Sequence, residues 1–541
     1  MTSDAPPVIT SRPLGWRAGR HPPAFDAHQI AALLPSVREP VHIVTSEPGL
    51  ARGVALGGEV TTAGTTDCLL AGTLPPLYPE WLGDRAFGET HGVRFPYVAG
   101  EMARGIATTR MVIAMARAEM LGIFGAAGLD PASIERAVGE LDGVLGRRHP
   151  WGVNLIYSPA DPALEEHTAG LLLARGVRII SASAYMDITL PLARCAAAGL
   201  RLDAAGRIVR PVQVFAKVSR PEVAEKFLSP PPAGLLAALV ARGQLTAGEA
   251  RLAAMVPVAE DVTVEADSGG HTDNQPLGAM LPAILALRDA ITARFGYQRQ
   301  IRVGAAGGLG SPQAVAGAFA LGAAYVLTGS VNQLAAESGV SDDARALLAQ
   351  ADLADVMMAP AADMFEMGIQ VQVLRRGTMF GPRARRLHEV YRGYPSIEAI
   401  PAPLRSTLER TVLGASLDEI WAQTRSYWQQ RDQSQLTRAE QDPKHRMALV
   451  FRWYLGSSSR WAVEGDTARR ADYQLWAGPA VGAFNRWAAG SFLAEAGERT
   501  VTQIALNLLE GAAVVTRAHQ ARTYGVPVPA GAFTFVPRRL G

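Results

Sequence analysis

The chain has 541 residues, of which 48% are hydrophobic and 19% are charged, and its formal net charge is +2. This near-neutral balance gives no electrostatic basis for binding nucleic acid or a membrane surface, and no apolar stretch is long enough to span a bilayer. The two cysteines, Cys68 and Cys195, lack CxxC spacing, which argues against a disulfide framework or a structural zinc site. We therefore expect a cytoplasmic protein without a bound metal.

Residues 1–90 are predicted to form a small N-terminal cap domain. The sequence VHIVT at 41–45 is typical of a strand, whereas the Gly-rich stretch 51–64 and the Pro-rich stretch 72–79 indicate turns and loops. No pattern in this part of the chain points to chemistry.

From residue 91 to about 335, eight short apolar runs alternate with helical stretches. The runs are 93–98, 120–124, 151–155, 177–180, 212–218, 262–265, 301–303 and 324–327. Near-continuous apolar strands separated by helices predict a parallel sheet, and eight of them favour a closed (β/α)8 TIM barrel over an open doubly wound sheet. We place this α/β barrel domain at residues 91–380.

Two helical additions to the barrel are predicted. The long connection after the fifth strand, residues 219–260, contains two helical segments, 234–240 and 246–255, and such insertions usually shape a substrate entrance. Residues 381–541 are predicted to form a C-terminal helical domain, because Leu, Ala, Trp and Arg recur there at helical spacing. Its tryptophans either pack its core or form a lid and docking surface for a large substrate.

Two glycine-rich strand ends, residues 303–312 and 325–330, carry the clearest functional signal. The loops after the last two strands of a TIM barrel commonly form a phosphate site, since glycine lets backbone N–H groups approach closely and a helix N-terminus adds a favourable dipole. We expect the amides of Gly307, Gly308, Gly329 and Ser330 to hold a phosphate. These glycines do not follow the GxGxxG spacing of a dinucleotide fingerprint.

The other strand ends supply groups that suit the ring of a flavin mononucleotide (FMN). A lysine at the polar edge of the ring would stabilise the reduced, anionic flavin, and Lys217 ends the fifth strand. The alternative for Lys217 is a salt bridge to Glu265 or Asp267. The remaining expected cofactor contacts are Gly100, Met102 and Ala103 along the ring, Asn154 at its polar edge, and Gly269 and Gly270 after the sixth strand.

Longer strings resemble known flavoenzymes. The motifs SGGH (268–271), GAAGG (304–308), TGS (328–330) and PYVAGEMA (96–103) resemble the nitronate monooxygenase and FabK-type enoyl reductase superfamily. Further strings resemble the PfaD family, the enoyl reductases of polyunsaturated fatty acid synthases and of polyketide synthases with trans-acting acyltransferases. They are HGVRFPYVAG (91–100), FAKVSRPEVAEKF (215–227), VEADSGGHTDN (264–274), TGSVNQ (328–333), APAADMF (359–365) and DPKHRM (442–447).

The resemblance, which covers nearly the whole chain, implies a stand-alone, trans-acting enoyl reductase that uses NADPH and FMN. Its substrate would be an α,β-unsaturated thioester on an acyl carrier protein, within a polyketide or fatty acid synthase assembly. Whether the protein forms a homodimer stays open. His271 lies in the loop that carries the catalytic histidine of the reductase relatives, so it is the candidate acid or oxyanion donor, with Lys217 as the second catalytic candidate. The alternative for His271 is a structural loop histidine that contacts the flavin phosphate or ribityl chain.

Two other functions stay open. The same scaffold could oxidise nitronates with oxygen instead of NADPH, although so small a substrate needs neither the insertion nor the helical domain. The chain could also be a non-catalytic scaffold that docks carrier proteins, but the intact glycine loops, Lys217 and His271 argue against a degenerate site.

Overall fold

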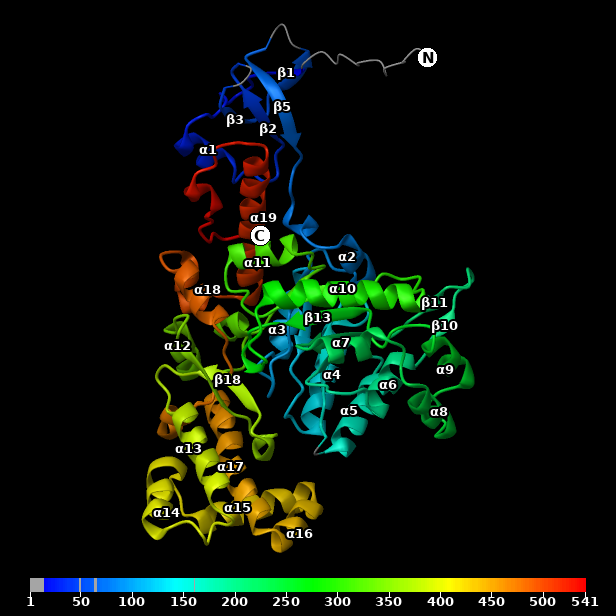
Figure 1. The fold of residues 1–541 in the computed structure, drawn as a ribbon, viewed down its shortest axis with the longest axis vertical. Coiled ribbons are helices and arrows are strands. Elements are labelled where there is room, and N and C mark those ends of the chain that lie inside the picture. The colour runs from blue at the N-terminus through cyan, green and yellow to red at the C-terminus, as the bar shows by residue number, and fades with distance from the viewer. Residues whose placement is uncertain (1–13, 48–49, 63–65, 160) are drawn as a thin grey trace, which may run out of the picture. The chain divides into compact units, whose positions relative to one another are not determined.

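The computed structural model describes residues 14–47, 50–62, 66–159 and 161–541 (Figure 1). The chain forms two compact units. The smaller unit contains the described residues of Met1–Leu82 together with Pro312–Gly317 and Leu506–Gly541. The larger unit contains Gly83–Ser311 and Ala318–Ala505. The division into domains 1–90, 91–380 and 381–541 stays a prediction.

The smaller unit is built on an antiparallel sheet with the order β3-β2-β5-β1-β4. Its strands are β1 (Leu14–Arg17), β2 (Val41–Thr45), β3 (Arg52–Leu56), β4 (Glu59–Thr62) and β5 (Cys68–Leu74). Residues of β2 and β3 pack with α1 (Ala27–Leu33) and with Ala518 and Ala521 of α19 (Val501–Thr523) to form an apolar core. The strand predicted at 41–45 is confirmed.

The larger unit is built on a closed barrel of eight parallel strands. They are β6 (Tyr97–Ala99), β7 (Leu121–Phe124), β8 (Gly152–Ile156), β9 (Ile179–Ser183), β12 (Gln213–Val218), β13 (Asp261–Glu265), β15 (Arg302–Ala306) and β16 (Val326–Thr328). Pairing of β16 with β6, Leu327 opposite Val98, closes the ring. Each strand overlaps one of the eight predicted runs, so the TIM barrel is confirmed.

Helices alternate with the barrel strands as a (β/α)8 fold requires. They are α2 (Arg85–His91), α3 (Thr109–Arg117), α4 (Pro131–Leu145), α5 (Pro162–Ala174), α6 (Leu190–Ala197), α7 (Pro221–Leu228), α10 (Leu277–Phe295) and α11 (Pro312–Ala320). Five of them begin at a side chain that accepts a hydrogen bond from the first-turn backbone, which satisfies a free N–H group there. These N-caps are Asp84, Thr108, Asp130, Asp161 and Thr189.

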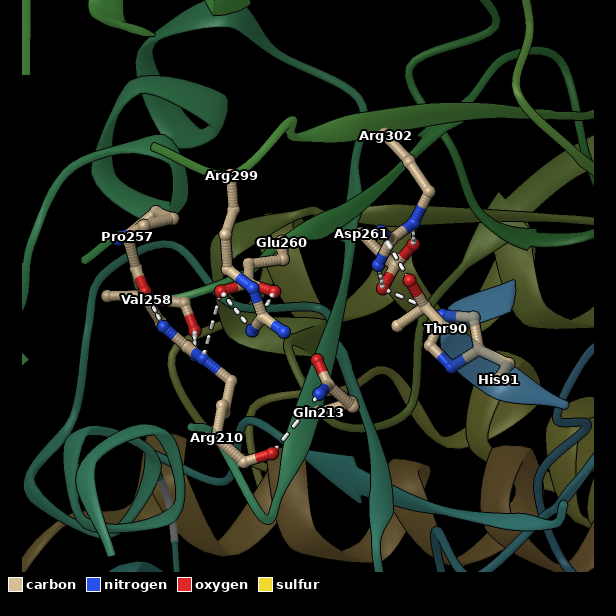
Figure 2. A network of polar contacts seen from close by, with 10 residues as sticks. All are labelled: Thr90, His91, Arg210, Gln213, Pro257, Val258, Glu260, Asp261, Arg299 and Arg302. Carbon is tan, nitrogen blue, oxygen red and sulfur yellow. Dashed lines mark hydrogen bonds and ion pairs between the residues drawn. The ribbon is translucent and has the colours of Figure 1, made fainter. Parts of the chain in front are cut away.

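The amino-terminal end of the barrel is closed by buried, paired charges (Figure 2). Arg302, the first residue of β15, donates two hydrogen bonds of 2.7 Å to Asp261, and Nε2 of His91 lies 3.0 Å from Oδ2 of the same carboxylate. Burial alone would raise the pKa of Asp261, but His91 and Arg302 outweigh it and lower the pKa to about 2. Beside it, Glu260 lies between Arg210 and Arg299. This end of the barrel carries charge whose partners are all protein groups.

The helical insertion after the fifth strand is confirmed, but its expected place at a substrate entrance is wrong. It forms α8 (Ala233–Ala241) and α9 (Ala247–Ala253), which pack against α6 and lie near the hairpin of β10 (Arg201–Leu202) and β11 (Ile208–Val209) (Figure 1). The reason is the direction of the chain. Helix α7 first carries it back to the amino-terminal end, where the N–H of Val258 donates to the carbonyl oxygen of Ser229.

The chain after β16 adds two strands to the loop that follows β13, which together form a small sheet, and it also contains the predicted C-terminal helices. In the sheet, β14 (Gly270–His271) pairs with β18 (Gln370–Leu374), and β18 pairs with β17 (Val356–Pro360). Helix α12 (Asp342–Ala349) precedes the predicted helical region. The helices that follow are α13 (Phe380–Gly393), α14 (Ala402–Leu408), α15 (Leu417–Arg431), α16 (Gln433–Gln441), α17 (Pro443–Glu464) and α18 (Ala480–Ala488). Trp461 is buried against the edge of Trp453, which confirms the packing interpretation for that tryptophan.

The described part of the chain offers neither a membrane-spanning helix nor a cluster of metal-ligating side chains. None of its helices has the length and apolar character needed to cross a membrane. Within the same residues, no cluster of three or more His, Cys, Asp or Glu side chains is arranged to hold a metal ion.

Candidate active site

A cavity of about 440 Å³ lies at the carboxyl ends of the barrel strands. Its wall is formed by the loops that follow seven of the eight strands, by Lys217 on β12, by α17 and by residues 474–480. Most of the side chains and loops predicted to hold a cofactor meet here. These residues are Met102, Ala103, Lys217, Gly269, Gly270, His271, Gly307, Gly308, Gly329 and Ser330.

Gly100 and Asn154 are not among the residues that line the cavity. A Cβ atom on Gly100 would lie 2.4 Å from Cδ2 of Leu327, so glycine is needed there for close packing of β6 on β16. The amide nitrogen of Asn154, which is buried, donates to the carbonyl oxygen of Ser181 and to Oγ of Ser183 on β9. The structure gives both residues packing contacts, and their contacts to a cofactor stay predictions.

The glycine loops present bare backbone to the cavity. A Cβ atom added to Gly308 or Gly329 would meet no other atom within 4 Å, and Gly308 has a left-handed φ of 71°. Side chains at these two positions would fill the space beside the backbone, so their absence leaves room for a ligand to approach the amides. Helix α11 begins directly after this loop, at Pro312. These features fit the phosphate of FMN, because close backbone approach is what a phosphate site needs.

Lys217 is held between two carboxylates. Its Nζ lies 2.9 Å from Oε1 of Glu265 and 3.5 Å from Oε1 of Glu101. Burial would lower the pKa of Lys217, but the two carboxylates outweigh this effect and raise the pKa above its usual value, so the ammonium stays charged. The predicted salt bridge to Glu265 is therefore present, whereas Asp267 instead accepts a hydrogen bond from the side chain of Asn274.

Glu101 is a cavity residue that sequence reasoning missed. It follows Gly100 directly after β6, and its Oε1 reaches across the barrel to accept a hydrogen bond of 3.0 Å from Ser181 on β9. The two residues are 80 positions apart in the chain, so no local sequence pattern predicts this contact.

His271 is paired with a second residue that the sequence did not indicate. Because β14 pairs with β18, His271 is carried close to the segment after β17, and its Nε2 lies 3.2 Å from Oδ1 of Asp363. Burial lowers the pKa of His271, but the hydrogen bond and the charge of Asp363, with a smaller contribution from Glu265, raise it overall. The pair favours the protonated imidazole, which is the form that can donate a proton.

The C-terminal helical domain completes the cavity wall. Leu455, Gly456 and Ser459 of α17 line it, together with Gln474 and Trp476. The tryptophan concentration of the sequence hinted at this role for Trp476, but the participation of α17 follows only from the fold.

Comparison with known proteins places the chain in a family. Residues 85–387 match the nitronate monooxygenase family model, and residues 394–473 match the model of the inserted helical domain of [acyl-carrier-protein] S-malonyltransferase. The enoyl reductase domain of MlnA, from the macrolactin biosynthesis cluster of Bacillus amyloliquefaciens, has a similar crystal structure. It is 36% identical with a TM-score of 0.78, and the match covers 82% of this chain and 99% of that domain.

Two longer proteins are similar over much of this chain. One polypeptide of the polyunsaturated fatty acid synthase of Thraustochytrium sp. is 44% identical over 448 residues, which is 82% of this chain and 30% of that polypeptide. Polyketide biosynthesis protein PksE of Bacillus subtilis is 40% identical over 445 residues, which is 82% of this chain and 58% of PksE. This chain thus spans less than two thirds of either relative. It belongs to the nitronate monooxygenase family and, within it, to the PfaD-like group that its motifs predicted.

Proposed function

We propose that this protein is a trans-acting, FMN-dependent enoyl reductase that uses NADPH to reduce the α,β-double bond of thioesters carried by an acyl carrier protein. The observation that carries the proposal is the cavity itself. One space at the carboxyl ends of the strands combines the open glycine loops, the buried Lys217 and the His271–Asp363 pair. The names of the relatives agree with this activity, since they belong to fatty acid and polyketide synthesis and include an enoyl reductase domain.

Each part of the cavity has a role in this proposal. FMN, once bound, would supply the hydride-transfer chemistry of the reaction. The amides of Gly307, Gly308, Gly329 and Ser330 would hold its phosphate, and Lys217 would face the polar edge of its ring. A proton that Asp363 favours on His271 would lie at the cavity wall, where it would be given to the enolate that hydride addition creates.

The proposed partners follow from the proposed reaction. An acyl carrier protein would deliver the thioester, and NADPH would supply the reducing equivalents, in the cytoplasm and alongside a synthase assembly. The wall formed by α17 and Trp476 is evidence for a substrate larger than a nitroalkane. These residues lie beyond the part of the chain that matches the nitronate monooxygenase model.

Oxidation of nitronates is the second candidate function, and the family model over residues 85–387 is the observation that favours it. The two candidates differ in their oxidant and reductant. The reductase needs NADPH and an enoyl thioester, whereas nitronate oxidation needs oxygen and a nitroalkane.

An anaerobic stopped-flow experiment separates the candidates. The protein loaded with FMN is mixed with NADPH and then with a crotonyl thioester on an acyl carrier protein, while the flavin absorbance is followed. Bleaching by NADPH and recovery that depends on the crotonyl group support the reductase. A flavin that NADPH does not bleach, but that a nitronate reduces, would replace this proposal with the oxidase. Failure to bind added FMN would leave the scaffold function.

A further inference from the structure

Glu101 carries a buried oxygen atom that the contacts around the cavity leave without a partner. The side chain of Glu101 is only 4% exposed, and its Oε1 faces Ser181 and Lys217. Its Oε2 is buried and has no hydrogen-bond partner among the described residues. A buried carboxylate oxygen without a donor is costly, and a proton on that oxygen would remove the charge responsible for the cost.

The charge around Lys217 is unbalanced. The ammonium of Lys217 contributes +1, and the carboxylates of Glu101 and Glu265 contribute −1 each, so the cluster carries a net charge of −1. The other titratable groups that act on this cluster do not neutralise it. Tyr325 stays neutral, because burial and nearby charges, including that of Glu101, raise its pKa well above the usual value. His271 is paired with Asp363.

We infer that Glu101 takes up a proton at Oε2 when a flavin bound in the cavity is reduced. Reduction adds negative charge beside a cluster that is already negative, and in a buried site this repulsion is strong. Two electrons come from the reductant, and the proton comes from water and forms the O–H bond at Oε2. When the cofactor is oxidised again, the O–H bond breaks and the proton returns to water. The inference rests on the FMN binding of the proposed function, but not on enoyl reduction.

The geometry selects Glu101 rather than Glu265 as the proton-holding residue. Glu265 has the shorter contact to Nζ of Lys217, 2.9 Å against 3.5 Å, and its side chain is 20% exposed, so water screens its charge better. A proton on Glu101 therefore keeps the Lys217–Glu265 pair intact and makes the cluster neutral. Glu101 is thus a proton-holding residue of the cavity.

The test is the number of protons taken up per two electrons, which needs no enoyl substrate. The FMN-loaded protein is titrated with dithionite at several pH values, and the midpoint potential is recorded in the parent, in Glu101→Gln and in a control, Glu165→Gln. Glu165 is also a buried barrel carboxylate, but it accepts hydrogen bonds from Tyr185 and Thr189 and does not line the cavity.

We expect the parent and the Glu165→Gln control to take up one proton more than Glu101→Gln. One extra proton per two electrons steepens the dependence of the midpoint potential on pH by about 30 mV per pH unit. Equal slopes in the parent and in Glu101→Gln would overturn the inference.

A second measurement uses the unmodified protein and covers the case in which Glu101→Gln does not hold FMN. The infrared difference spectrum of reduced minus oxidised protein should contain a new carboxylic acid C=O band. Absence of that band in a protein that binds and reduces FMN would overturn the inference while leaving the reductase proposal standing. Loss of enoyl-dependent reoxidation with the band present would overturn the reductase proposal and leave the inference about Glu101 standing.

Discussion

The two ends of the barrel use charged side chains in different ways. At the amino-terminal end, Asp261 receives two hydrogen bonds from Arg302 and one contact from His91, and Glu260 lies between Arg210 and Arg299. At the carboxyl end, Lys217 has two carboxylates and Glu101 keeps one oxygen without a partner. At the first end each carboxylate has two basic partners, whereas at the second end two carboxylates share one lysine.

This difference indicates where the molecule uses charge for stability and where it uses charge for chemistry. A buried charge whose partners are all protein groups stabilises the fold. Loss of one partner leaves the remaining charge buried and uncompensated, which lowers the free energy of unfolding. A buried charge with an incomplete set of partners favours binding of a ligand or a proton. Substitutions at the two ends should therefore affect different properties.

The largest effect is expected from Asp261→Ala at the amino-terminal end. The substitution leaves Arg302 and His91 buried without their shared carboxylate, so the free energy of unfolding should fall by about 3–5 kcal/mol. Urea unfolding followed by circular dichroism measures the change. Glu135→Ala, which breaks a half-exposed pair with Arg175, is the control and should cost less than about 1 kcal/mol. Equal losses in the two variants would contradict a stabilising role for the buried charges.

His271→Ala should have the next largest effect, on turnover rather than on stability. Loss of the proton donor should slow reduction of the enoyl thioester by about 10² or more, while the FMN content stays that of the parent. Steady-state NADPH oxidation, divided by bound FMN, measures this effect. A variant with the turnover of the parent would leave His271 only a structural loop residue.

Gly308→Ala should weaken FMN binding by about tenfold, which corresponds to about 1.4 kcal/mol. The new Cβ atom would occupy the open space beside the loop, at a residue whose φ is 71°. Gly206→Ala is a matched control, since Gly206 has a φ of 75°, has open space around it and lies in the exposed turn between β10 and β11. Fluorescence titration with FMN should show weaker binding only in Gly308→Ala. A similar loss in both variants would indicate backbone strain instead of a phosphate site.

Asp363→Asn should have the smallest effect, a shift in the pH dependence. Asp363 raises the pKa of His271, so the stabilisation from this pair is complete below the usual histidine pKa of about 6.5 and is lost as the pH rises through the raised value. Activity that needs protonated His271 should fall over the same range. In Asp363→Asn the fall should occur at lower pH. A pH profile identical to that of the parent would show that this ion pair does not control the acid.

Much of the fold followed from the sequence because barrel strands are short, apolar and buried. Each of the eight runs became a strand, although β15 extends to Ala306, since glycine and alanine at its end are compatible with a strand but do not signal one. The place of the insertion was predicted wrongly because α7 lies between the fifth strand and the insertion. This helix returns the chain to the amino-terminal end of the barrel before the insertion begins.

The candidate site could be predicted only where single residues or loops carry the signal. The glycine loops, Lys217 and His271 stand at strand ends and were found there. Glu101 and Asp363 act through partners that are 80 and 92 residues away, so they become visible only when the barrel and the β14–β18 pairing are known.

The most direct test compares the two ends in one chemical step. The reduced, FMN-loaded protein is mixed with a crotonyl thioester on an acyl carrier protein, and the rate of flavin reoxidation per bound FMN is measured in His271→Ala and in Arg299→Gln. We predict that His271→Ala slows this step by about 10² or more, and that Arg299→Gln, which changes only the amino-terminal end, keeps the parent rate. A parent rate in His271→Ala, or an equal loss in both variants, would contradict the assignment of chemistry to the carboxyl end of the barrel.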